Sequence, residues 1–197
     1  MEFLLDYGLL ALVVFLINTV PAFMPPTWTI LLFFYLKFDL SFLPSVVVGA
    51  TFATLGRIVL YFLSLNFFGP FLSKESRKNL EALGSYFNTN TRITVPLILA
   101  YAFLPVPSNQ VYIAAGLSKV NIKILAFSFF VGRLMSYSFW VWGSYKVADR
   151  LEDVFANQYS RMGGLIVDIA GFFLLYLLTK INWKKILKGA LGNNFPY

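Results

Sequence analysis

Four long apolar stretches decide what this chain can fold into. Residues 3–20, 42–68, 122–145 and 163–180 each approach or exceed the ~20 apolar residues that cross the ~30 Å hydrocarbon layer of a membrane. The chain is 58% hydrophobic and 13% charged, with a mean hydropathy of +0.71. Soluble domains do not have this composition. We therefore predict an all-α polytopic membrane protein.

Two residue types that carry much of enzyme chemistry are missing. The chain of 197 residues contains no cysteine and no histidine. Disulfides, thiol chemistry, imidazole proton relays, zinc sites of the Cys/His type and catalytic triads are therefore excluded. We expect a protein that is not an enzyme and that needs no cofactor or metal.

Charged residues between the apolar stretches separate into two sets. Most cations lie in the polar segment 73–92, at Lys119 and Lys123, and in the tail from Lys180 onward, whereas the remaining loops are acidic on balance. The positive-inside rule then predicts a multi-pass protein of the plasma membrane with a cytoplasmic C-terminus. The basic tail would also bind anionic headgroups, although an orientation signal is its simpler interpretation. We expect no nucleic-acid partner.

Two proline clusters interrupt apolar segments that are too short to cross a membrane. Segments 93–103 and 108–118 flank Pro105 and Pro107, and about 11 helical residues reach roughly 16 Å, half the layer. We predict a re-entrant hairpin that begins and ends on one face. Pro21, Pro25 and Pro26 predict another, although its first arm, 3–20, is long enough to span. A kinked helix in an ordinary span is the alternative for both.

The two hairpins belong to an apparent internal repeat. A shift of 82 residues aligns Pro25 with Pro107 and Lys37 with Lys119, so that KFDLSFL lies over KVNIKIL. Each unit reads as a hairpin, a charged corner and a long helix, with the corners on opposite faces. That pattern predicts an inverted repeat, as in secondary transporters. Chance self-alignment of a Leu/Phe-rich chain is the alternative.

One membrane domain, 1–197, then accounts for the whole chain. Repeat 1 covers about 3–70, an amphipathic cytoplasmic segment covers 73–92, and repeat 2 covers about 93–148. A transmembrane helix at 163–180 and a basic tail at 181–197 follow.

Polar groups inside the apolar stretches are the candidate binding residues. A charge at membrane depth usually faces the bundle interior or a cavity. Helices that begin after Pro26, with Thr27 as a cap, and at Ser108 or Asn109 would aim their positive N-termini inward from opposite faces. Together with arginine donors they would bind a phosphate at the midplane, the lipid tail remaining in the bilayer. The substrate-binding set is Arg57, Arg133, Ser108, Asn109, Gln110 and Thr27.

Each candidate has a structural alternative. Either arginine could pair with Asp168 or extend to an interface, and Asn18 or Asn109 could cap a broken helix. Asp168, if it lies deep, is instead the candidate for proton coupling. Small residues let membrane helices approach closely, which is the role we expect of four glycines, Gly49, Gly56, Gly132 and Gly143.

The order of these features resembles the DedA family, also called the VTT or SNARE-associated membrane domain. The similarity covers about residues 18–150 and rests on GATFATLGRIVLYFLSLNFFGPFLSK after the first hairpin and on FLPVPSNQVYIAAGL with the following glycine-containing helix. The matching positions are Gly49, Ala50, Gly56, Tyr61, Gly69, Ala115, Gly116, Gly132, Gly143 and Tyr145.

The resemblance implies two re-entrant hairpins of inverted topology and the transport or scrambling of lipids. Bacterial members are associated with recycling undecaprenyl phosphate and eukaryotic ones with phospholipid scrambling. Many bacterial members carry an acidic residue in the first hairpin and an arginine in the second. Here those hairpins offer Asn18 and Thr27, and Asn109 and Gln110, so coupling through a hairpin carboxylate is not expected.

We therefore expect a membrane transporter or scramblase that moves phosphate-bearing lipids, phospholipid or polyprenyl phosphate, between leaflets. Its partners are membrane lipids, and assembly into a homo-oligomer stays open. The alternatives are a secondary transporter of a small ion or solute and a non-transporting membrane scaffold.

Overall fold

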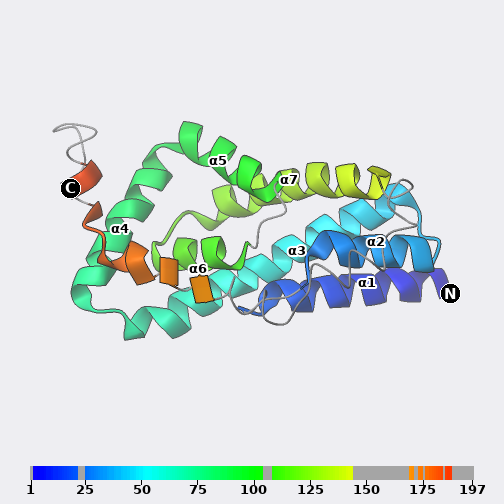
Figure 1. Cartoon of the computed structure of the whole chain (residues 1–197), viewed down its shortest axis with the longest axis horizontal. Coiled ribbons are helices and arrows are strands. Elements are labelled where there is room, and N and C mark those ends of the chain that lie inside the picture. Colours follow the sequence, from blue (N-terminus) through cyan, green and yellow to red (C-terminus); the bar gives the residue numbers. More distant parts are fainter. Residues whose placement is uncertain are drawn as a thin grey trace.

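The computed structural model (Figure 1) describes residues 2–21, 25–103, 108–143, 169–170, 173–174, 176–183 and 185–187. Within these ranges every regular element is a helix, which confirms the predicted all-helical class for the described residues. The α-helices are α1 (Glu2–Thr19), α2 (Thr27–Lys37), α3 (Phe42–Leu63), α4 (Lys74–Thr89), α5 (Thr91–Phe103), α6 (Asn109–Leu117) and α7 (Ile122–Gly143). A π-helical turn, Ser64–Phe68, and a 3₁₀ turn, Gly69–Phe71, continue α3.

Two of these helices are long and apolar enough to cross a membrane. They are α7 and the segment Phe42–Phe71, which is α3 with its two following turns. The predicted stretches 42–68 and 122–145 correspond to them, and the polar segment 73–92 forms α4. Most of the predicted helix 163–180 lies outside the described residues.

The corners that join α2 to α3 and α6 to α7 have the same backbone structure. Asp39 and Lys119 adopt positive φ angles of 48° and 57°. The following amides bond back across each corner, from Leu40 N to Tyr35 O at 3.2 Å and from Val120 N to Ala115 O at 3.0 Å. This is the Schellman pattern of a helix C-terminus. The corners therefore match at a shift of 80 residues.

The predicted shift of 82 matches the starts of the two short helices, Thr27 and Asn109, but not the corners, because α2 has 11 residues and α6 has 9. It paired Lys37 with Lys119, but Lys37 is the last residue of α2, whereas Lys119 lies two positions beyond the end of α6. The positive-φ residue Asp39 is its structural counterpart. The two-residue difference in helix length therefore gives the helix starts and the corners different registers.

A side chain from another helix, α1 in the first unit and α4 in the second, holds each corner. The hydroxyl oxygen of Tyr7, near the start of α1, accepts from Ser41 N at 2.9 Å. At the equivalent place in the second unit, Oδ1 of Asn88, just before α5, accepts from Asn121 N at 2.7 Å. The α2–α3 corner therefore lies beside the start of α1, and the α6–α7 corner lies beside the end of α4, which α5 follows directly.

The two units point in opposite directions (Figure 1). The α2–α3 corner lies at the end that carries the N-terminus, and the α6–α7 corner lies at the far end. The short helices α2 and α6 both begin near the middle, and α3 and α7 run antiparallel along the long axis. This arrangement brings the starts of α2 and α6 toward the centre of the molecule.

Close packing at three glycines holds the bundle together. A Cβ at Gly56 would lie 2.6 Å from the carbonyl oxygen of Phe15, and one at Gly132 would lie 2.6 Å from Cβ of Ala102. A Cβ at Gly49 would overlap the Leu31 side chain. The predicted packing role is thus confirmed for these three. At Gly143, the last residue of α7, an added Cβ would meet no heavy atom of the described residues outside its own helix within 4 Å, so its packing role stays a prediction.

Candidate functional site

Two buried arginines and three tyrosines form the polar centre of the molecule, called here the arginine cluster. It consists of Arg57 from α3, Arg133 and Tyr137 from α7, Tyr101 from α5 and Tyr112 from α6. Both arginines are only 6% exposed. Arg57 lies close enough to Arg133 for their positive charges to repel, and the Tyr112 ring packs edge-on against Phe129, 5.1 Å between centroids, on the same face of α7 as Arg133. The cluster therefore joins four helices from both units.

Aromatic rings hold the Arg133 guanidinium in place. Its central carbon lies 4.9 Å from the ring centroid of Phe129 and 5.5 Å from that of Tyr137. Phe129 and Tyr137 stand four residues before and after Arg133 and so share its face of α7. Cation–π contacts of this kind favour a charged side chain away from water.

Each arginine is connected to the start of one short helix, Arg57 to that of α2 and Arg133 to that of α6. Nδ2 of Asn18 donates to Thr27 Oγ1 at 2.9 Å, and the carbonyl oxygen of Asn18 accepts from Arg57 Nη1 at 3.0 Å. On the other side, Arg133 Nη2 makes a long contact of 3.4 Å with Ser108 Oγ. The first residue of α2 and the residue before α6 therefore flank the arginine pair.

Neither helix start is capped by the side chain of its N-cap residue. The N-cap of α2 is Pro26, so the predicted capping role of Thr27 is wrong. Thr27 lies inside the first turn because proline, which fits a helix start, precedes it, and its hydroxyl accepts from Asn18. Ser108 is the N-cap of α6 but makes no capping bond. Both starts keep the positive end of the helix dipole.

The cluster contains polar atoms that the described part of the protein does not satisfy. Nε of both arginines, the hydroxyls of Tyr112 and Tyr137, and Oδ1 of Asn18 are buried without a hydrogen-bond partner there. Neither arginine has an ion pair among the described residues, where the one ion pair joins Lys119 to Glu81. A buried charge without compensation is costly. The arrangement suits a bound anion.

The other predicted site residues are not members of the arginine cluster. Asn109 is buried in the first turn of α6, whereas Gln110 is half-buried and no hydrogen bond among the described residues joins it to the cluster. Three of the predicted turn prolines, Pro21, Pro25 and Pro26, lie between α1 and α2. Pro105, Pro107 and Asp168 lie outside the described residues.

The three tyrosines of the cluster, and Phe129 beside Arg133, are residues that sequence reasoning missed. Phe129 and Tyr137 could have been found from their spacing of four about Arg133. Tyr101 and Tyr112 carry no such signal, because their positions depend on how α5 and α6 pack against the long helices.

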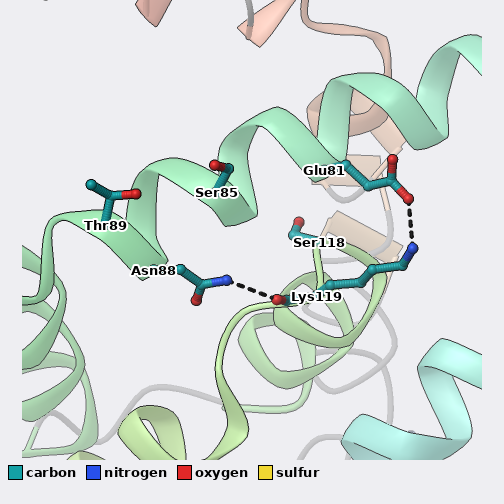
Figure 2. A pocket seen from close by; sticks show the side chains of 6 residues that line it. All are labelled: Glu81, Ser85, Asn88, Thr89, Ser118 and Lys119. Carbon is teal, nitrogen blue, oxygen red and sulfur yellow. Dashed lines mark hydrogen bonds and ion pairs between the residues drawn. The ribbon is translucent and has the colours of Figure 1, made fainter. Parts of the chain in front are cut away.

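A polar cavity, of about 340 Å³, lies where α4 meets the α6–α7 corner (Figure 2). Lys119 Nζ pairs with Glu81 Oε1 at 2.7 Å, and Asn88 Nδ2 donates to Lys119 O at 3.1 Å. The ion-paired side chains are 58% and 40% exposed, so water weakens their attraction. These contacts fasten α4 to the corner, which is a structural role.

The described residues contain no group of three or more acidic side chains that could hold a metal ion. Comparisons with protein families, with curated proteins and with solved structures find no match for this chain.

Proposed function

We propose that this protein is a membrane lipid transporter or scramblase that moves phosphate-bearing lipids between leaflets through the arginine cluster. The observation that carries the proposal is the pair of buried arginines, which lack acidic partners among the described residues and lie between two helix N-termini. The resemblance to the DedA family points the same way.

Exposed apolar side chains support a membrane location. Besides the two long apolar helices, large hydrophobic side chains face outward along α1, α3 and α7. Water-exposed surfaces of soluble proteins rarely carry apolar patches of this extent. On these three helices the most exposed of them are Leu4, Leu5, Leu12, Leu43, Phe127, Met135, Phe139 and Trp142.

The short helices support re-entrant hairpins. With 11 residues in α2 and 9 in α6, these arms reach about 16 and 14 Å, half of the ~30 Å hydrocarbon layer. Both hairpins begin and end at one end of their unit, and the two units are oppositely directed. In an inverted repeat of this kind, the binding site lies near the midplane, where broken helices meet.

Phosphate is the anion that best matches these donors. Guanidinium groups bind phosphate oxygens bidentately, and the starts of α2 and α6 add their dipoles. The Tyr112 and Tyr137 hydroxyls offer two more donors on the same centre. No covalent step is needed, since binding the headgroup at mid-depth lowers the barrier to its crossing.

Leaflet exchange in reconstituted vesicles tests the proposal. Labelled phospholipid and labelled polyprenyl phosphate are placed in one leaflet, with and without the protein. We expect the protein to accelerate exchange of at least one of them above empty vesicles. No acceleration of either would contradict the proposal, and uptake of inorganic phosphate instead would make the site that of a solute carrier.

A further inference from the structure

An apolar cavity of about 370 Å³ lies between α4, α5, α6 and the C-terminal segment 176–183. Its walls include Phe87 of α4, Leu97 and Tyr101 of α5, Ala114 of α6 and Trp183. Almost all of its lining is hydrophobic. Apolar cavities remain dry and take up apolar ligands rather than water.

Tyr101 connects this cavity to the arginine cluster. The residue lines the cavity, and the next residue, Ala102, packs directly against Gly132, the neighbour of Arg133 in α7. An apolar compartment and a cationic, donor-rich one therefore meet at a single side chain. A molecule that fits both must be amphiphilic, with an anionic head and an apolar chain.

The far side of the cavity is formed by the residues best suited to a membrane surface. α4 is amphipathic and contributes Leu83 and Phe87, and the Trp183 indole donates to Leu178 O at 2.9 Å. Tryptophan and amphipathic helices are typical of the headgroup level. The cavity thus extends from the buried cluster to the elements that would lie at that level.

We propose that this cavity encloses an apolar chain of the lipid whose phosphate binds at the arginine cluster. The proposal rests on the proposed function. It changes the expectation that the lipid tail remains in the bilayer, because here the protein holds the apolar chain of the lipid. Chain length and width then become determinants of which lipid is accepted.

Protection of a single cysteine tests the proposal, since the native chain has none. Ala114→Cys places a thiol on the cavity wall with a small change in volume, and Leu55→Cys, on the exposed side of α3, is the matched control. Each full-length variant is treated with methyl methanethiosulfonate in the presence of butyl or dodecyl phosphate. Butyl phosphate carries the same headgroup but is too short to fill the cavity.

We expect dodecyl phosphate at ten times its Kd to slow modification of Ala114→Cys about tenfold. Leu55→Cys should be unaffected, butyl phosphate should protect neither, and adding Arg133→Ala should remove the protection. Equal protection by both phosphates, no protection, or protection that survives Arg133→Ala would overturn the proposal.

Thermal unfolding separates a failure of this proposal from a failure of the proposed function. Butyl phosphate should raise the Tm of the wild-type protein and not that of Arg133→Ala, because it occupies the headgroup site alone. If butyl phosphate raises the wild-type Tm while dodecyl phosphate leaves Ala114→Cys unprotected, the phosphate site stands but the cavity does not enclose the lipid's apolar chain. If it raises neither Tm, the phosphate site itself is contradicted.

Discussion

Tyr112 and Tyr137 are almost fully buried residues, at 1% and 0% exposure, and their hydroxyl oxygens are buried with them. Neither hydroxyl has a hydrogen-bond partner in the described part of the chain. Leaving a buried donor unsatisfied costs about 1–3 kcal/mol. A phosphate oxygen at the arginine cluster would accept from these groups and remove that cost.

Tyr112→Phe separates a role in binding from a role in folding. Because the hydroxyl has no described protein partner, its removal should leave the Tm of the ligand-free protein unchanged or raise it. Exchange of phosphate-bearing lipid should fall several-fold, since a donor to the headgroup is lost. Thermal unfolding and leaflet exchange on the same preparation measure both effects.

Tyr61→Phe is the matched control for this change. The Tyr61 hydroxyl donates to Val120 O at 2.9 Å, so its loss should lower the free energy of unfolding by about 1 kcal/mol. Exchange per folded molecule should not change. If Tyr112→Phe instead lowers the Tm while sparing exchange, the hydroxyl is structural.

At the scale of single residues, the two buried arginines were predictable from the sequence, but the residues that surround them were not. A charge inside an apolar stretch points to Arg57 and Arg133 without any structure. The tyrosines of α5 and α6 reach the cluster through tertiary packing. The capping role of Thr27 failed because Pro26, with its fixed φ, already forms the helix start.

Among the elements, α4 depends on a glycine for its contact with the α6–α7 corner. A Cβ at Gly84 would overlap the carbonyl group of Ser118. The neighbouring contacts of Glu81 and Asn88 come from the same face of α4, three residues before and four after (Figure 2). The helix is therefore fitted to this corner and does not merely lie beside it.

Gly84→Ala should destabilise the protein despite the higher helix propensity of alanine. The methyl group would push α4 from the corner, and overpacking of this kind costs about 1–3 kcal/mol. Gly8→Ala in α1 is the control, because no atom of the described residues lies within 4 Å of the added methyl. It should stabilise the helix by up to about 1 kcal/mol.

Chemical unfolding of the two glycine variants gives the comparison. A Gly84→Ala protein as stable as Gly8→Ala would contradict the close contact.

The boundaries of α3, α4 and α7 were predictable from hydrophobic and polar runs, since these are local signals. The register of the two corners was not predictable, because it depends on the backbone angles of Asp39 and Lys119.

The whole molecule consists of two units whose corners lie at opposite ends (Figure 1). The charge pattern alone predicted opposite faces for these corners. The repeat also predicted one midplane site for Arg57 and Arg133, whereas the packing of α5 and α6 around that site depends on tertiary contacts.

Single cysteines at equivalent corner positions test the inverted arrangement. In vesicles, Ser41→Cys and Asn121→Cys should react with a membrane-impermeant maleimide from opposite sides, since both positions are exposed. Lys78→Cys, exposed on α4, should react from the same side as Asn121→Cys. Labelling of Ser41→Cys and Asn121→Cys from one side would rule out the inverted repeat.

The central claim is that the buried arginine pair binds the phosphate of a transported lipid. Leaflet exchange by Arg57→Ala and Arg133→Ala, set against Arg77→Ala, tests it most directly. Arg77 is an exposed arginine that donates to Gly69 O at 2.9 Å and lies outside the cluster.

Loss of a charge-assisted hydrogen bond, about 1.5–3 kcal/mol, should slow exchange by about 10- to 100-fold in each cluster variant. Arg77→Ala should exchange lipid at the wild-type rate. Exchange by Arg57→Ala and Arg133→Ala as fast as that of Arg77→Ala would contradict the claim.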